Sequence, residues 1–167
     1  ISVKLSALHP RYEFAQRARV MHELGPRLLE LVGQARQAGI ALTVDAEEAE
    51  RLELSLQLVD VVLESDVTRG YEDFGLAVQA YQKRAYGVLE WLVGRTRQLR
   101  RRITVRLVKG AYWDTEIKRA QERGLAGFPV FTRKAHTDVS YLACARLLAG
   151  NMNVIHPQFA THNAHTV

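Results

Sequence analysis

Residues 103–113 read Ile-Thr-Val-Arg-Leu-Val-Lys-Gly-Ala-Tyr-Trp. The β-branched and apolar run over Ile103–Val108 predicts a strand, because such side chains suit a pleated and half-buried surface. A helix is expected to follow, from about Asp114 to Arg123. The strand therefore ends in a loop, Lys109–Trp113, that combines a cation, a glycine and two aromatic side chains.

This unit of a strand followed by a helix recurs on both sides of residues 103–113. The first expected helix, Glu13–Ala38, contains Pro26, which could split it in two, because proline removes a helical hydrogen bond. Six strands alternating with five helices predict a parallel sheet joined by crossover helices. The expected strands are Val3–Ala7, Ile40–Val44, Phe74–Ala80, Ile103–Val108, Val130–Thr132 and Val154–Ala160, and the expected helices are Glu13–Ala38, Asp45–Leu63, Arg84–Leu99, Asp114–Arg123 and Thr137–Ala149.

The loops after the strands distinguish a barrel from an open doubly wound sheet. A dinucleotide-binding sheet carries GxGxxG after its first strand, and the sequence has neither this motif nor a GxxxxGK[ST] phosphate loop. Instead, polar residues follow nearly every expected strand, which is where a barrel builds its site. These residues are Asp45, Gln79, Lys109, Thr132, Arg133, Lys134, Thr161, His162 and Asn163.

The expected fold is therefore an α/β fold, an incomplete (β/α)8 TIM-type barrel. A full barrel has eight strands and typically about 250 residues, whereas these 167 residues supply six expected strands. We expect residues 1–167 to be the middle strands of one barrel domain. The first and last strands and the final helix are expected to be missing.

The composition is that of an ordinary globular chain. Hydrophobic residues make up 47% and charged residues 25%, which is close to average. Cys144 is the single cysteine and falls in an apolar helical pattern, which favours a buried thiol over a catalytic one. No window approaches the roughly 18–20 apolar residues that span a bilayer, and residues 1–6 lack the layout of a signal peptide.

The net charge of +5 is concentrated between Arg95 and Arg106. Such a cluster raises nucleic-acid binding as a hypothesis. Cations also favour the last turn of a helix, where backbone carbonyls are unpaired. No aromatic residues interleave with these arginines, as single-strand binding requires. We therefore interpret the cluster as a solvated helix end and expect no nucleic acid to bind this segment.

Four polar residues in or beside apolar strands are candidates for a site. Lys4 could form an anion or Schiff-base site, or could extend its ammonium to solvent at a strand edge. Asp45 could cap the next helix and also act in a site. Gln79 and Arg106 lie inside apolar runs, where burial is costly unless the group is bonded, and this favours a site.

The loop Lys109–Trp113 could approach a ligand closely, because Gly110 has no side chain and the aromatic residues could stack on a flat ring. The alternative is a tight turn with core aromatics. Together these residues predict a cationic, partly aromatic site for an anionic ligand with a planar part, without identifying that ligand. His162 and His165 have an i, i+3 spacing, but no HExxH motif accompanies them, and no metal site is expected.

Several dispersed segments closely resemble the proline dehydrogenase family, and the resemblance covers essentially the whole chain. Residues 106–121, RLVKGAYWDTEIKRAQ, are the most specific, and their continuation past Trp113 most resembles the bifunctional form, proline utilization A. The other segments are 1–12 (ISVKLSALHPRY), 44–48 (VDAEE), 78–84 (VQAYQKR), 129–134 (PVFTRK), 137–145 (TDVSYLACA) and 159–165 (FATHNAH).

This resemblance implies an oxidoreductase of proline catabolism, a flavoprotein with a distorted (β/α)8 barrel that holds FAD without a covalent link. It implies oxidation of L-proline to 1-pyrroline-5-carboxylate by hydride transfer from substrate C5 to flavin N5. It also implies a membrane quinone as electron acceptor and an aldehyde dehydrogenase domain in the parent chain. The implied location is cytoplasmic, with peripheral attachment at the inner membrane.

The resemblance also implies roles for individual residues. Arg106, Lys4 and Asp45 match catalytic residues: the arginine hydrogen-bonds the flavin near N5, and the lysine meets the substrate carboxylate. Lys4, Asp45, Tyr112 and Ala111 match residues of the proline pocket. The positions that match FAD contacts are Gln79, Arg106, Val108, Lys109, Gly110, Ala111, Trp113, Thr132, Arg133, Lys134, Thr161, His162 and Asn163.

One part of the family's site has no match in this sequence. A tyrosine and a pair of arginines on the last barrel helix complete the family's carboxylate clamp, and no segment here resembles that helix. Because paired charge-assisted hydrogen bonds contribute strongly to binding, we expect this fragment alone to be inactive. Two other hypotheses stay open: a Schiff-base aldolase that uses Lys4 or Lys109, and a non-enzymatic segment that binds a partner or nucleic acid through its arginines.

Overall fold

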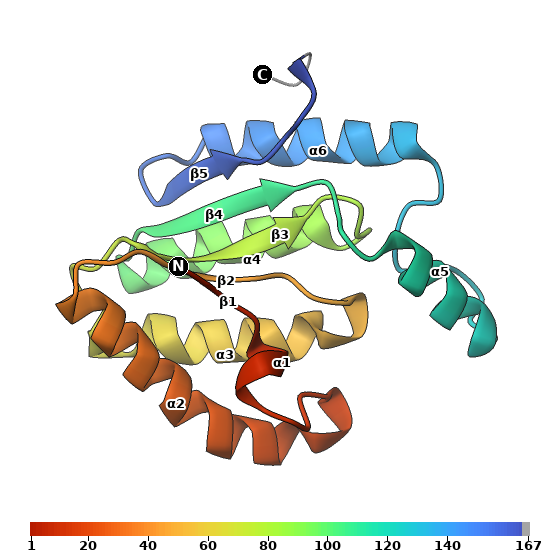
Figure 1. The fold of residues 1–167 in the computed structure, drawn as a ribbon. Coiled ribbons are helices and arrows are strands. Elements are labelled where there is room, and N and C mark those ends of the chain that lie inside the picture. Colours follow the sequence, from red (N-terminus) through yellow and green to blue (C-terminus); the bar gives the residue numbers. More distant parts are fainter. Residues whose placement is uncertain (165–167) are drawn as a thin grey trace.

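The computed structural model describes residues 1–164 and contains one sheet of five parallel strands (Figure 1). The strands lie side by side in their order along the chain. Because a doubly wound sheet reverses its strand order at a switch point, this sequential order confirms the barrel type of fold, although the sheet over residues 1–164 is not closed. The strands are β1 (Ser2–Val3), β2 (Leu42–Val44), β3 (Phe74–Gln79), β4 (Ile103–Val108) and β5 (Ile155–Phe159).

Helices join successive strands and pack around the outer side of the sheet. Neighbouring helices contact one another in chain order, α2 with α3, α3 with α4 and α4 with α6. Figure 1 shows α5 apart from this layer, beyond the carboxyl ends of the strands. The helices are α1 (Leu5–Leu8), α2 (Arg17–Gln37), α3 (Leu52–Glu64), α4 (Ala85–Leu99), α5 (Trp113–Glu122) and α6 (Lys134–Ala149), with short 3-10 turns η1 (Phe14–Gln16), η2 (Ala49–Arg51) and η3 (Asp66–Thr68).

The alternation of side chains in β4 separates the core from the site. Ile103, Val105 and Leu107 are buried in the apolar core between sheet and helices. Successive side chains of a strand point to opposite faces, so Arg106 points to the inner face of the sheet. There it is in register with Ala77 of β3 and Gln158 of β5.

Helix α2 shows how periodicity builds the outer layer. Val20, Leu24, Leu28 and Val32 recur at helical spacing, and all four are fully buried. Burial of each such side chain contributes about 1.5–3 kcal/mol. The helix runs unbroken through Pro26, which lies on its exposed side, so the expected helix is one element and not two.

The expected strand Val130–Thr132 is wrong. Val130 makes an isolated antiparallel bridge to Gln82 and joins no strand of the sheet. β4 and β5 pair directly with each other, so no place exists between them for a further strand. Residues 129–131 instead attach to the loop after β3, through a 3.0 Å hydrogen bond from Lys83 N–H to the Pro129 carbonyl and a 2.8 Å bond from Phe131 N–H to the Tyr81 carbonyl.

Other boundaries shift by a few residues. The first strand ends at Val3, because the chain turns into α1 at Leu5. Asp45 does not cap the next helix, since three residues separate it from the turn η2, which begins at Ala49. No helix in residues 1–164 combines the length and apolarity needed to cross a membrane.

Candidate functional site

Four residues from distant parts of the sequence meet at the carboxyl end of the sheet. Lys4 follows β1, Asp45 follows β2, Arg106 lies in β4, and Tyr112 lies in the loop before α5. Lys4 Nζ donates a 2.8 Å hydrogen bond to the Tyr112 hydroxyl. Arg106 Nη1 lies 3.7 Å from Asp45 Oδ1. The residues predicted to act on the substrate thus form one cluster.

Side chains from three other strands hold the Arg106 guanidinium across the inner face. It donates hydrogen bonds to Ser2 Oγ (3.1 Å), Gln158 Oε1 (3.3 Å) and Thr43 Oγ1 (3.5 Å). The side chain keeps 33% of its surface exposed. Arg106 is therefore oriented by neutral acceptors while part of its charge stays available to a ligand.

The Lys4 ammonium is stabilised in its charged form. The Tyr112 hydroxyl raises the pKa of Lys4, and Asp45 and Glu47 raise it further, against the opposing effect of burial. A lysine that forms a Schiff base needs a lowered pKa, because its neutral amine is the nucleophile. This environment favours binding of an anion over imine formation.

Gln79 ties two loops of the site together. Its Nε2 donates a 2.9 Å hydrogen bond to the Glu47 carbonyl, and its Oε1 accepts a 2.9 Å bond from Ala111 N–H. The side chain is 2% exposed. Gln79 therefore connects the loop after β2 with the loop after β4, a role that the sequence did not predict for it.

Gly110 allows the loop after β4 to pack on an aromatic ring. Its φ of +149° lies in the region that favours glycine. A Cβ atom there would lie 2.3 Å from Cγ of Tyr81. The Tyr81 hydroxyl in turn accepts a 3.3 Å hydrogen bond from Tyr112 N–H, and burial raises its pKa.

Two open hollows flank this loop, and Lys109, Gly110 and Lys134 line both of them. The Trp113 hollow has a volume of about 320 Å³ and is lined by Tyr81, Lys109, Gly110, Trp113, Phe131, Thr132, Lys134 and Thr137. The His162 hollow has a volume of about 770 Å³ and is lined by Val108, Lys109, Gly110, Ala111, Lys134, Phe159, Ala160, Thr161, His162 and Asn163.

The predicted cofactor-contacting residues gather at these hollows with three exceptions. Arg106 lies on the inner face of the sheet and lines neither hollow. Gln79 lies beneath the loop, and Arg133 precedes α6 as an exposed residue that lines neither hollow. The Trp113 indole N–H donates a 3.0 Å hydrogen bond to the Phe131 carbonyl, which fixes the ring at the mouth of its hollow. Thr132 was expected at the end of a strand. In the structure it reaches the site from the connection between α5 and α6.

Asp138 is a residue of this region that the sequence reasoning missed. It accepts hydrogen bonds from Lys109 Nζ (2.6 Å) and from Lys134 Nζ (2.7 Å). The i, i+4 spacing of Lys134 and Asp138 was a visible signal of their pairing. The contact with Lys109 spans 29 positions and carried no local signal.

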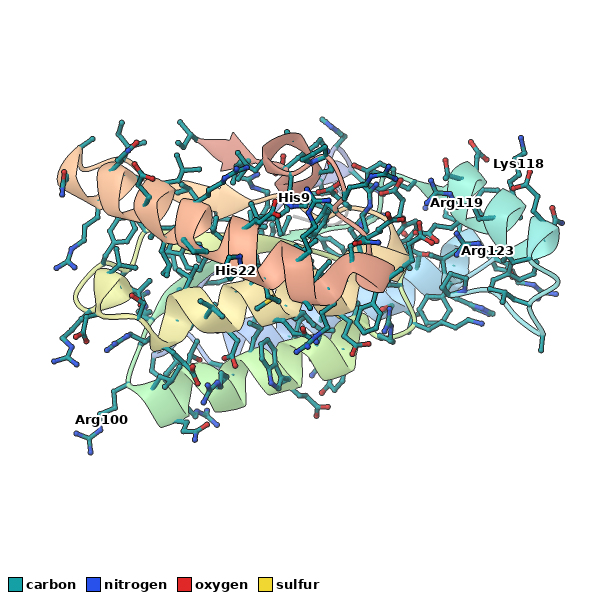
Figure 2. The ribbon with its side chains drawn as sticks, turned by 90° about the horizontal axis from the view of Figure 1, so that it is seen from below. His9, His22, Arg100, Lys118, Arg119 and Arg123 are labelled. Atoms are coloured by element: carbon teal, nitrogen blue, oxygen red, sulfur yellow. The ribbon has the colours of Figure 1, made fainter. Side chains whose placement is uncertain are left out.

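Glu116 is a second missed residue. Its Oε1 accepts a 2.6 Å hydrogen bond from Ala49 N–H, which attaches α5 to the segment that follows β2. Burial raises the pKa of Glu116, and Glu48 and Glu50 act in the same direction. Figure 2 shows Arg119 and Arg123 on the side of α5 toward the rest of the molecule, where both pair with Glu50.

Apart from Arg106, the arginine cluster lies away from this site. Figure 2 shows Arg100 at the end of the molecule opposite α5. Arg95 pairs with Asp60 and Glu64 on α3. Arg102 pairs with Glu72. The cluster is therefore partly neutralised by local carboxylates.

The histidine pair gives no metal centre that can be described. His162 lines its hollow, whereas His165 lies outside the described residues. Within residues 1–164, no group of three or more His, Cys, Asp or Glu side chains is placed to hold a metal ion.

Comparison with known proteins assigns this arrangement to a family. The family model described as proline dehydrogenase matches residues 1–167. The chain belongs to the proline dehydrogenase family. This membership confirms the resemblance inferred from residues 106–121 and the dispersed segments around them.

Several similar proteins are bifunctional. The chain is 58% identical over 167 residues to the bifunctional protein PutA of Salmonella typhimurium strain LT2 and 56% identical to that of Escherichia coli K12. Both comparisons cover 100% of this chain and 13% of the relative. The chain thus spans about an eighth of the length of these relatives.

Solved structures of the family share the fold. A mutant of Bradyrhizobium japonicum proline utilization A superposes with a TM-score of 0.97 at 60% identity. The proline utilization A of Bdellovibrio bacteriovorus, inactivated by N-propargylglycine, superposes with a TM-score of 0.94 at 32% identity. Each comparison covers 99% of this chain and 17% of the solved one.

Proposed function

We propose that this chain forms part of an FAD-dependent proline dehydrogenase that oxidises L-proline to 1-pyrroline-5-carboxylate. In this reaction, C5 of proline loses a hydride to flavin N5 and the ring nitrogen loses a proton. The observation that carries the proposal is the convergence of Lys4, Asp45, Arg106 and Tyr112 beside two hollows with cationic and aromatic linings. Family membership supports the same activity.

The residues around the hollows fit FAD, which joins a planar ring system to a negatively charged diphosphate. Lys109 and Lys134 offer ammonium groups to an anion at both hollows. Trp113, 43% exposed, offers an aromatic face. Gly110 lines both hollows, and its lack of a side chain lets this loop pack on the Tyr81 ring. We propose that these residues hold FAD together with Val108, Ala111, Thr132, Arg133, Thr161, His162 and Asn163.

Arg106 is proposed to contact the flavin near N5. A cation at this place favours the electron-rich reduced ring, and this is how a protein tunes a cofactor without altering its chemistry. Ser2, Thr43 and Gln158 orient the guanidinium without neutralising it. Asp45, whose Oδ1 lies 3.7 Å from Arg106 Nη1, is proposed to frame the proline pocket.

Lys4 is proposed to bind the proline carboxylate. Its ammonium is kept charged by the Tyr112 hydroxyl, and a charged donor forms stronger hydrogen bonds to a carboxylate than a neutral one. Tyr112 and Ala111 are proposed to frame the pocket beside it. The same raised pKa argues against the alternative of a Schiff-base aldolase at Lys4.

The setting of this segment is also part of the proposal. Residues 1–167 are proposed to belong to a longer barrel, since β1 and β5 leave the described sheet with two unpaired edges. The bifunctional relatives support a parent chain with a further domain, and we propose that this is an aldehyde dehydrogenase domain. A membrane quinone is the proposed electron acceptor, reached from the cytoplasm by peripheral attachment.

The test uses the purified parent polypeptide that contains residues 1–167. Its visible spectrum is recorded, and L-proline is then added without oxygen. The expected result is a flavin band that bleaches with L-proline and not with D-proline, and that bleaches much more slowly in Arg106→Met. A protein that stays colourless after FAD is supplied overturns the flavin assignment.

A further inference from the structure

Asp138 on α6 joins two lysines of the site. Its Oδ1 accepts a 2.6 Å hydrogen bond from Lys109 Nζ, and its Oδ2 accepts a 2.7 Å bond from Lys134 Nζ. Both lysines line both hollows, whereas Asp138 is not among the lining residues of either. The carboxylate therefore acts on the hollows through the two ammonium groups.

The contact with Lys109 is not a simple surface pair. Lys134 and Asp138 lie four positions apart on α6, a common spacing on helices. Lys109 comes from the end of β4, 29 positions before Asp138, and its ammonium also lies 5.8 Å from the centre of the buried Tyr141 ring. Two residues of α6, Asp138 and Tyr141, thus contact the Lys109 ammonium.

The Asp138 carboxylate keeps its charge when both lysines are bound to it. Lys109 lowers the pKa of Asp138 most, and Lys134 lowers it further. An ionised carboxylate accepts hydrogen bonds and donates none. Asp138 can therefore serve as an acceptor for both ammonium groups at neutral pH.

We propose that Asp138 is a positioning residue, which holds Lys109 and Lys134 side by side so that their remaining N–H groups face the diphosphate of FAD. The inference rests on the proposed function. Each ammonium has three donors, and one on each is bonded to Asp138, so two on each stay available. Asp138 itself touches no part of the cofactor.

The carboxylate has two effects on these lysines. Two ammonium groups without an anion between them repel each other, and the Asp138 oxygens remove this repulsion before the ligand arrives. A free lysine also populates many rotamers, which must become ordered when it binds a phosphate. With Asp138 in place, part of this ordering precedes binding, and an organised site binds more tightly.

The test compares FAD with riboflavin, which carries the ring system without the diphosphate. Apoprotein of the parent polypeptide is titrated with each flavin, and binding is followed by quenching of flavin fluorescence. Asp138→Asn is expected to weaken FAD binding about tenfold, the scale of one charge-assisted hydrogen bond, and to leave riboflavin binding unchanged. Asp138→Glu, which keeps the charge, is expected to retain most of the affinity.

A matched control and a double variant separate positioning from general damage. Asp60→Asn also removes a carboxylate that binds a cation, Arg95, but on the outer helices, and it is expected to leave both affinities unchanged. In a Lys109→Met background, Asp138→Asn is expected to cause a smaller further loss of FAD affinity, because the part of its effect that acts through Lys109 is already absent.

The outcomes distinguish this inference from the proposed function. If the wild-type protein binds no FAD, both the proposed function and the positioning role of Asp138 are overturned. Wild-type protein whose flavin is reduced by proline, together with an Asp138→Asn variant that binds FAD equally well or more tightly, overturns only the positioning role. Equal losses for FAD and riboflavin in Asp138→Asn also overturn it, because they indicate damage that does not involve the diphosphate.

Discussion

Lys4 and Tyr112 are joined by a 2.8 Å hydrogen bond across 108 positions of sequence, with the ammonium as donor and the hydroxyl as acceptor. The bond connects the end of β1 with the loop before α5, and the Tyr112 ring also lies 5.6 Å from the ammonium. The hydroxyl is the largest cause of the raised pKa of Lys4. Tyr112 thus controls how far into alkaline pH Lys4 keeps its charge.

This relationship predicts a shift in pH dependence for Tyr112→Phe. A raised pKa means that the charged form of Lys4 persists below that pKa and is lost as pH rises through it. The KM for proline is therefore expected to rise at alkaline pH, and the rise is expected to begin at lower pH in Tyr112→Phe. Steady-state kinetics of the parent enzyme between neutral and alkaline pH measure both curves. Tyr86→Phe on the exposed side of α4 is the control, and superimposable profiles for Tyr112→Phe and wild type contradict the prediction.

Gln79→Leu is expected to destabilise the protein. It leaves the Glu47 carbonyl and Ala111 N–H without their partner, and each unpaired buried group costs about 1–3 kcal/mol. Urea denaturation is expected to show a loss of about 2 kcal/mol or more in the free energy of unfolding. Gln37→Leu, at the exposed end of α2, serves as the control and is expected to change the free energy of unfolding by less than about 0.5 kcal/mol.

Gly110→Ala is expected to disrupt the site. The added Cβ meets the Tyr81 ring at 2.3 Å, and the φ of +149° disfavours any residue with a side chain. Gly94→Ala in α4 is the matched variant, since a Cβ there has nothing within 4 Å and alanine favours a helix by about 1 kcal/mol. The melting temperature is expected to fall for Gly110→Ala and to rise for Gly94→Ala. FAD affinity is expected to fall for Gly110→Ala alone.

Glu116→Gln is expected to weaken the pH dependence of the free energy of unfolding. Burial raises the pKa of Glu116. At a pH between the unfolded and the folded pKa, the Glu116 carboxyl is therefore still protonated in the folded protein and already ionised in the unfolded chain. Stability is therefore expected to fall as pH rises from the unfolded pKa through the folded one. The difference in unfolding free energy between wild type and Glu116→Gln, measured from pH 4 to about pH 7, isolates this effect. Glu53→Gln, exposed on α3, is expected to leave the slope as in wild type.

Polypeptide 1–167 by itself is expected to oxidise no proline at a useful rate. The inner face of the described sheet is open, and the arginine pair that completes the family's carboxylate clamp has no counterpart in the matching segments. A dye-coupled assay on the purified polypeptide, with the parent enzyme as positive control, measures this directly. Turnover near that of the parent enzyme contradicts the expectation.

The sequence predicted the fold well where local pattern sufficed. Ile103–Val108 is a strand with the expected bounds, because its alternation of buried and inward-facing residues is a property of neighbouring positions. The predicted strand Val130–Thr132 was wrong, because the local pattern did not decide its structure. Two apolar residues and a threonine after a proline resemble a strand, but they have no place in the sheet, because β4 and β5 pair directly with each other.

The sequence by itself determined the barrel type of fold and the kinds of residue at each strand end, because hydrophobic periodicity and strand-end polarity depend on residues close together in the chain. Only the tertiary structure decided which of these residues act together. Lys4 with Tyr112, the two loops joined by Gln79, and Asp138 with Lys109 are contacts over 29 to 108 positions. No local pattern encodes such contacts, because they exist only after the strands have aligned their carboxyl ends.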